Sequence, residues 1–249
     1  MPSGEPLIFL PGWLATRYWW HRQAEAFAGD YGVLAVDYPA VEGAGPHNVD
    51  AYAEWVQAAL EGFGRPAILV GWSLGAGVAL RMVELFGTGG LRGLVLVDQT
   101  PRSLADADWP HNVIGLDEAR RVSTLQMVRS GLSGIAETVV RSSFSRDPDP
   151  QLLARLRTEA LRWDAEAAAT LLSDHWDRDY RDAASSIDVP TLLIGGGKSA
   201  FTPAGALEFL RDAIPGAKLE MLPDSGHAPF LEEPERFNAL LAAFLDRLS

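Results

Sequence analysis

The five residues Gly71-Trp72-Ser73-Leu74-Gly75 could place a reactive serine at a sharp turn. The apolar run 67–70 before them predicts a buried strand, and the apolar spacing over 74–86 after them predicts a helix. Glycine on both sides leaves room for a strained backbone, and the amino end of a helix favours negative charge that develops beside the serine. This nucleophile elbow predicts that Ser73 attacks an acyl group.

A serine hydroxyl becomes a good nucleophile when a base removes its proton, and histidine is the usual base. The chain has five histidines, His21, His47, His111, His175 and His227. Only His227 follows the last predicted strand, in a turn from which an imidazole could cross the edge of a sheet. We therefore expect His227 to be the base. The other four are expected to have surface or packing roles, although His21 and His111 could face a pocket.

The elements that must position these residues alternate along the first hundred positions, which is typical of a parallel sheet covered on both faces. The predicted strands cover 7–10, 33–36, 67–70, 94–97, 191–194 and 218–222, and the predicted core helices 18–27, 49–63, 74–86, 204–213 and 234–248. Between the fourth and fifth strands, four helices are predicted at 116–129, 134–144, 150–163 and 165–176. The sequence thus predicts an α/β core of residues 1–101 and 187–249, with a helical lid at 102–186.

Composition and charge exclude several classes of protein. The chain has 249 residues, of which 47% are hydrophobic and 22% charged, as in ordinary globular proteins. The absence of cysteine excludes disulfides and thiolate sites. No apolar run approaches the roughly 20 residues that span a bilayer, and the first residues do not resemble a secretion signal. We therefore expect a cytoplasmic protein that binds no membrane.

The net charge of −12 disfavours nucleic acid as a partner. Residues 102–186 are less acidic than the rest, with 11 arginines against 14 acidic residues, compared with 10 basic and 19 acidic residues elsewhere. This difference is expected to reflect solvated helix faces, or else an arginine-bearing surface over a substrate entrance. Near the end of the chain, Glu232, Glu233 and Glu235 are expected to cap and solvate the last helix and not to bind a metal.

Over essentially its whole length the chain resembles the α/β-hydrolase superfamily. The matching segments are 9–13, 36–39, 71–75 and 226–234. Through Gly12-Trp13, the serine turn and Asp108-Trp109-Pro110, it is similar to the lidded bacterial carboxylesterases typified by the pimeloyl-carrier-protein methyl ester esterases. The resemblance implies a mostly parallel central sheet, a serine esterase without metal or cofactor, and an oxyanion hole formed by the backbone N–H groups of Trp13 and Leu74.

One position departs from the family pattern. The family's acid usually follows the strand after the insertion, and alignment on Thr202-Pro203 places Ser199 there. A hydroxyl cannot stabilise an imidazolium as a carboxylate does. Asp98 closes the strand 94–97, which by family topology lies beside the nucleophile strand, about 4.8 Å away. We therefore expect Asp98 to complete a Ser-His-Asp triad. Asp224 is the alternative, but its place in a tight turn favours a capping role.

These features predict a serine hydrolase that cleaves a carboxylic ester or lactone through an acyl-enzyme on Ser73. The alternatives are hydrolysis of a C–C bond or a thioester, perhydrolysis, and a non-hydrolytic cyclisation or binding protein. We expect a medium-sized, largely apolar ester, with an acyl group bound to an acidic carrier protein as a further possibility. The side chains expected to line its pocket are Trp72, Trp109, Trp19, Leu125 and Phe144, with a core position as the alternative for each.

Overall fold

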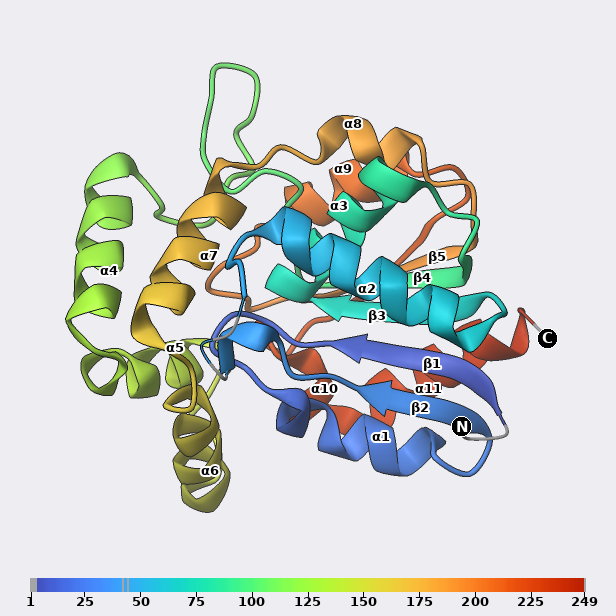
Figure 1. Cartoon of the computed structure of the whole chain (residues 1–249), viewed down its shortest axis with the longest axis horizontal. Coiled ribbons are helices and arrows are strands. Elements are labelled where there is room, and N and C mark those ends of the chain that lie inside the picture. The colour runs from blue at the N-terminus through green and yellow to red at the C-terminus, as the bar shows by residue number, and fades with distance from the viewer. Residues whose placement is uncertain (1–3, 42, 44, 249) are drawn as a thin grey trace.

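A six-stranded parallel sheet forms the centre of the computed structural model, which describes residues 4–41, 43 and 45–248 (Figure 1). The strands are β1 (Glu5–Leu10), β2 (Tyr31–Ala35), β3 (Ala67–Trp72), β4 (Leu91–Val97), β5 (Thr191–Gly196) and β6 (Lys218–Leu222). Their order is β2-β1-β3-β4-β5-β6, and every neighbouring pair is parallel. All residues of β3 and β5 are buried, as expected for strands covered on both faces. The predicted fold class is confirmed.

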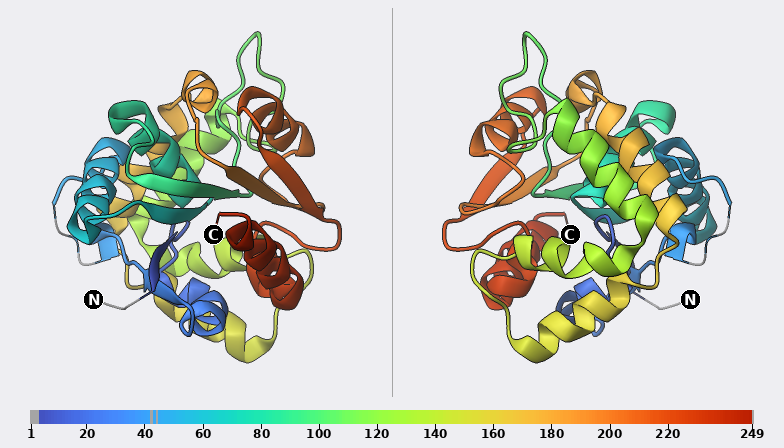
Figure 2. Two further views of the ribbon diagram at one scale, coloured as in Figure 1. Left: turned by 90° about the vertical axis from the view of Figure 1, so that its right-hand side faces the viewer. Right: turned by 90° about the vertical axis from the view of Figure 1, so that its left-hand side faces the viewer.

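Helices cover both faces of the sheet (Figure 2). One face carries α1 (His21–Phe27) and α11 (Pro234–Asp246), and the other carries α2 (Val49–Phe63), α3 (Leu74–Phe86), α8 (Arg181–Ser185) and α9 (Ala204–Ala213). Helix α2 has the predicted bounds because its ends are marked in the sequence. The Asn48 side chain accepts a hydrogen bond from the Ala51 N–H, and Gly64 ends the helix at a φ of 64°.

Further helices separate β4 from β5 and lie beyond the carboxyl ends of the strands (Figure 1). They are α4 (Glu118–Ser130), α5 (Ala136–Ser142), α6 (Pro150–Ala160) and α7 (Ala165–Asp177). Three of them begin after an aspartate, Asp117, Asp149 or Asp164, whose side chain accepts backbone N–H groups of the first turn. The four predicted helices are therefore present. No helix among the described residues is long and apolar enough to cross a bilayer.

Stacked aromatic rings join the start of the chain to its end. Trp20 lies 5.0 Å from Phe9 of β1 and 4.0 Å from Phe230, between ring centroids. Phe230 belongs to the short helix α10 (Pro229–Glu232), which directly follows the segment carrying His227. Each close aromatic pair contributes about 0.5–1.5 kcal/mol beyond the area that it buries. The core thus fixes the segment that presents the histidine.

Candidate active site

Ser73 occupies a strained turn between β3 and α3. Its φ of 52° and ψ of −120° lie in a region that non-glycine residues rarely adopt, and its N–H donates to the Val97 carbonyl at 3.0 Å. A Cβ at Gly71 would lie 2.5 Å from the Gly75 carbonyl oxygen, and one at Gly75 would lie 2.5 Å from the Leu10 carbonyl oxygen. Glycine at both positions is therefore what lets β1, β3 and α3 meet tightly enough to form the turn.

Asp98 and His227 are hydrogen bonded at the adjacent strand end. Asp98 directly follows β4, has no exposed surface, and places Oδ1 2.7 Å from Nδ1 of His227. The same oxygen accepts the Ser199 hydroxyl at 2.7 Å, while Oδ2 accepts the Gly196 N–H at 2.7 Å. Hydrogen bonds to a carboxylate are stronger than those between neutral groups. The three donors around Asp98 therefore hold its side chain in place beside the imidazole.

Ser199 has a role that the sequence did not reveal. Its Oγ accepts the N–H groups of Phe201 at 3.3 Å and Thr202 at 3.1 Å. A hydroxyl has one proton to donate, and these two donors leave that proton for Asp98. The position that usually supplies the acid in this family thus supplies a hydrogen bond to an acid on the neighbouring strand.

Asp224, the alternative acid, lies at the surface. Its side chain is 78% exposed and pairs with Lys198 at 2.8 Å. The hydrogen bond from the Lys198 ammonium lowers the pKa of Asp224. The described contacts bring Asp98, and not Asp224, to the imidazole.

Two glutamates hold the His227 turn. Glu232 accepts the N–H of Ser145 at 2.7 Å and that of Gly226 at 3.0 Å, and Glu233 accepts the Ser225 hydroxyl. The expectation that these residues solvate the last helix is therefore wrong for Glu232 and Glu233. Ser145 is 87 positions away from Glu232 in the chain, so the local sequence pattern could not predict this hydrogen bond.

Glu235 is exposed in the first turn of α11, as expected. The other side of the His227 turn is held from β3, because the Trp72 indole N–H donates to the His227 carbonyl at 2.7 Å. Across the described residues, no three His, Asp or Glu side chains form a group that could hold a metal ion.

Trp13 and Leu74, whose backbone N–H groups are expected to form the oxyanion hole, lie close to Ser73. Leu74 is the first residue of α3, so its N–H is among those that a helix leaves without an intrahelical acceptor. Trp13 lies in the turn after β1, where a Cβ at Gly12 would lie 2.9 Å from the Trp72 ring. Trp13 and Leu74 both line the cavity that holds Ser73 and His227.

That cavity has a volume of about 330 Å³ and lies between the strand ends and the inserted helices. Four of its residues come from one face of α4, namely Arg120, Ser123, Thr124 and Met127. Their spacing of three, four and seven positions places them on one side of a helix. The inserted helices thus supply a large, partly polar wall facing the serine.

Of the five side chains expected in the pocket, only Trp72 lines this cavity. Trp19 stacks on Trp72 at 4.8 Å and lies 6.3 Å from Phe144, with no part of either in the cavity lining. Leu125 is buried in the hydrophobic core, and Trp109 packs on α9. For these four the expectation was wrong because large apolar side chains fill cores as readily as pockets.

Polar residues that the sequence did not assign to the site also line the cavity, among them Gln99 and His175. His175 had been expected to have a surface or packing role. His21 stacks on Tyr18, and His111 lies against Trp109, neither of them in the cavity lining. The available signal for Gln99 was its position directly after Asp98, at the carboxyl end of a strand.

The chain is similar in sequence to known bacterial esterases. The chain is 30% identical over 254 residues to the pimeloyl-[acyl-carrier protein] methyl ester esterase of Chromobacterium violaceum, covering 98% of this chain and 95% of the relative. It is 28% identical over 239 residues to that of Nitrosomonas europaea, covering 94% and 93%.

The structure superposes on an esterase from Exiguobacterium antarcticum with a TM-score of 0.91 and 21% identity, covering 99% of this chain and 93% of the other. For a thermophilic esterase from Thermogutta terrifontis the TM-score is 0.85 and the identity 22%, covering 100% and 92%. At these identities the likeness shows the fold. The model of the alpha/beta hydrolase family matches residues 7–240. This chain belongs to the alpha/beta hydrolase family.

Proposed function

We propose that the protein hydrolyses a carboxylic ester or lactone through an acyl-enzyme on Ser73. The observation that carries the proposal is the shared cavity of Ser73 and His227, together with the 2.7 Å bond from His227 to the buried Asp98. An imidazole that donates Nδ1–H to a carboxylate keeps Nε2 as its basic nitrogen. That nitrogen can then take the proton of the serine hydroxyl.

The reaction proceeds in two balanced steps. The Ser73 oxygen attacks the ester carbonyl carbon while His227 accepts the hydroxyl proton, and the departing alcohol takes that proton as the C–O bond breaks. Water then attacks the acyl-enzyme with His227 again as base, releasing the acid and restoring the serine. The backbone N–H groups of Trp13 and Leu74 would stabilise the oxyanion in both steps, by about 3–4 kcal/mol per donor in well-studied enzymes.

The relatives support ester hydrolysis over the alternatives, because both carry the name of a methyl ester esterase. The non-hydrolytic alternative depended on Ser199 standing where the family acid is expected. The bond between Asp98 and His227 weakens that argument, since a carboxylate reaches the imidazole from the neighbouring strand.

Labelling with a fluorophosphonate tests the proposal without a known substrate. We expect one adduct by intact mass, lost in Ser73→Ala and retained in Ser142→Ala, a second serine that lines the cavity. Hydrolysis of 4-nitrophenyl esters should follow the same pattern. A folded protein that forms no adduct and cleaves no ester would overturn the assignment of Ser73.

We also propose that residues 102–186 act as a lid. Helices α4, α5 and α7 contribute to the cavity wall, which supports a role in access. Asp164 Cβ lies 3.6 Å from the position of a Cβ at Gly43, within the range of a disulfide, at the cost of some backbone strain because Gly43 has a φ of 66°. Because the chain has no cysteine, Gly43→Cys with Asp164→Cys forms a single bond between insertion and core. Oxidation should slow turnover of long esters, and reduction of the same variant should restore it; equal rates would exclude opening at this edge.

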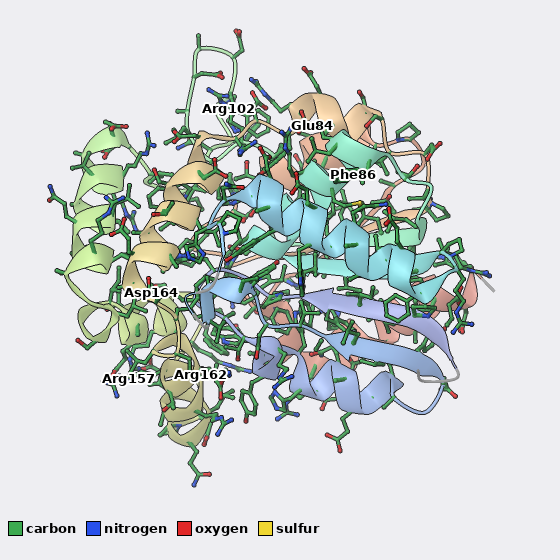
Figure 3. The ribbon with its side chains drawn as sticks, in the orientation of Figure 1. Glu84, Phe86, Arg102, Arg157, Arg162 and Asp164 are labelled. Atoms are coloured by element: carbon green, nitrogen blue, oxygen red, sulfur yellow. The ribbon has the colours of Figure 1, made fainter. Side chains whose placement is uncertain are left out.

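A carrier-bound acyl ester is the finer substrate that we propose, as the names of the relatives suggest for them. Most arginines of the insertion are neutralised locally, such as Arg162 by Glu159 and Arg102 by Asp179. In Figure 3, Arg102 lies near α8, whereas Arg157 lies on α6 and Arg162 lies just beyond its end. These arginines therefore do not form one free basic surface.

Arg120 differs from them. It lines the cavity, pairs with no carboxylate among the described residues, and reaches only the carbonyl oxygens of Ile114 at 3.5 Å and Gly115 at 3.3 Å. Arg120→Gln should lower kcat/KM about tenfold for an ester on an acidic carrier protein and much less for a short neutral ester. Arg129→Gln, which removes an arginine paired with Glu166, is the control. Equal losses on both substrates would exclude carrier recognition by Arg120.

A further inference from the structure

One wall of the cavity carries three polar side chains that are almost fully buried. Gln99, Ser103 and His175 are 4%, 2% and 5% exposed, and all three line the cavity. Gln99 and Ser103 belong to the segment that leaves β4 after Asp98, and His175 belongs to α7. Buried polar groups are normally paired within the protein, so the atoms that these three leave free define what the wall can bind.

The amide of Gln99 has both of its hydrogens in use. Its Nε2 donates to the Thr100 carbonyl at 2.7 Å and lies 3.3 Å from Nε2 of His175. The reverse orientation would set the amide oxygen against the Thr100 carbonyl oxygen, so the nitrogen position is fixed by this contact. The Gln99 oxygen accepts no hydrogen bond from a described residue and is the atom left for a ligand.

His175 is held neutral. Because its Nε2 accepts from Gln99, its proton is on Nδ1, and burial lowers the pKa of the imidazole to about 4. A Cβ at Gly77 would lie 2.4 Å from Cε1 of His175, so only glycine lets this ring pack on α3. Gly77 is four residues after Ser73, one turn along the same helix. The imidazole therefore lies beside the nucleophile helix and anchors the Gln99 amide there.

Ser103 adds a second oxygen to the wall. Its backbone carbonyl accepts the Val113 N–H at 3.0 Å, which fixes the loop, while the hydrogen bonds among the described residues do not involve its hydroxyl. The polar atoms left free are thus the Gln99 oxygen, which accepts, and the Ser103 hydroxyl, which accepts and donates. The Nδ1–H of His175 is also without a partner, but it is fully buried against α3.

We propose that Gln99, Ser103 and His175 form a subsite for a neutral hydrogen-bond donor of the substrate, a hydroxyl or an amide N–H. The inference rests on the proposed ester hydrolysis and names its substrate class. An anionic group would meet the Gln99 oxygen without a positive partner on this wall, and a cation would lose its hydration without a free counter-charge. A few placed polar groups in a mainly apolar cavity are what orient a ligand.

Matched esters test the subsite. One pair differs on the acyl side, 4-nitrophenyl hexanoate and 4-nitrophenyl 6-hydroxyhexanoate, and the other on the alcohol side, propyl hexanoate and 2-hydroxyethyl hexanoate. We expect kcat/KM to favour the hydroxylated member of one pair about tenfold, because the apolar member leaves the buried oxygens unpaired. Gln99→Leu and Ser103→Ala should each bring that ratio close to one.

Ser143→Ala is the matched control, because this buried serine lines the cavity but donates its hydroxyl to the Val139 carbonyl at 3.1 Å. It should keep the wild-type ratio. Ser103→Ala removes a single oxygen and so carries the test if Gln99→Leu does not fold. Equal hydrolysis of both members of both pairs by the wild-type protein would overturn the subsite and leave the hydrolase function intact. Failure to cleave any ester or to react with a fluorophosphonate would instead contradict the proposed function.

Discussion

The ends of β4 and β5 are neighbours in the sheet but are built differently. The β4 end carries buried polar residues, where Asp98 is followed by Gln99 and Thr100. The β5 end consists of glycines and then turns outward to the exposed Lys198. A Cβ at Gly196 would lie 1.7 Å from the Gly226 carbonyl oxygen, so this end serves close backbone contact. One end supplies the carboxylate, and the other packs around it and donates hydrogen bonds.

This difference indicates that the imidazole needs a carboxylate oxygen beside its Nδ1, and that either strand can provide it. Adjacent strands are about 4.8 Å apart, so a carboxylate on either one can reach His227 with a modest change of direction. Asp98 has a φ of 46°, a left-handed backbone that aspartate tolerates better than most residues. The Ser199 hydroxyl then fills the place of the displaced acid and binds its replacement.

Replacing the acid of the β4 end should give the largest effect. Asp98→Asn keeps the shape of the side chain but sets an amide N–H₂ against either the Gly196 N–H or the His227 ring N–H, both of which are donors. In a Ser-His-Asp triad this change lowers kcat about 10⁴-fold by favouring the wrong tautomer. We expect a loss of that size in ester hydrolysis.

Asp224→Asn is the matched control at the exposed alternative and should keep wild-type kcat. Urea unfolding of both variants separates catalysis from folding. Wild-type turnover by a folded Asp98→Asn variant would show that the carboxylate of Asp98 has no part in the reaction.

Exchanging the two strand ends sharpens the comparison. Asp98→Ser combined with Ser199→Asp moves the carboxylate to the usual family position while keeping a hydroxyl at the other. We expect this double variant to be about 10²-fold more active than Asp98→Ser alone, because a carboxylate again reaches the imidazole. An exchange without any gain would mean that the β5 end no longer has room for the acid.

Removing the supporting hydroxyl should have a smaller effect. Ser199→Ala deletes one donor to the buried Asp98 carboxylate, and hydrogen bonds to charged groups contribute about 1.5–3 kcal/mol. We expect kcat to fall about tenfold, with rescue by Ser199→Thr. Ser186→Ala, whose hydroxyl donates to the Ala183 carbonyl, is the control. If Ser199→Ala has the same kcat as Ser186→Ala, the hydroxyl of Ser199 has no part in positioning Asp98.

The smallest effect concerns stability at low pH. Burial lowers the pKa of His175 from 6.5 to about 4, so the unfolded chain binds this proton more readily than the folded one. The free energy of unfolding is therefore not reduced by this proton above pH 6.5. It falls by about 1.4 kcal/mol per pH unit as the pH drops from 6.5 towards 4. Urea unfolding at pH 7 and pH 5 should show a smaller loss of stability in His175→Gln. An identical loss in both proteins would mean that the folded and unfolded chains bind this proton equally well.

Much of the fold could be predicted because its elements carry local signals. Helix α2 has an asparagine cap, an apolar face and a final glycine, and α3 follows the serine turn directly. The short helices α8 and α10 were not predicted, since five and four residues show no helical period. Their positions depend on contacts with the core.

In the site, too, the residues that carry local sequence signals could be predicted, and those that depend on distant contacts could not. Ser73 and His227 occupy turns that the sequence marks, and Asp98 could be inferred because the usual position is empty. Gln99 had only the signal of its position after Asp98, and the contact that brings His175 to it joins residues 76 positions apart. The pocket aromatics were misplaced for a different reason, since residue type does not tell a core tryptophan from a lining one.

Because Asp98 precedes the insertion, the two parts of the chain on either side of the insertion supply different numbers of triad residues. The nucleophile and the acid both lie within the first 98 residues, and only the base follows α4 to α8. In the usual arrangement, both acid and base must be brought back into place after whatever the insertion contains. Here a transplanted set of inserted helices has to restore the alignment of one residue, whose turn Glu232 binds to Ser145 of the insertion. In such a scaffold, replacing the inserted segment is a direct way to change the range of substrates.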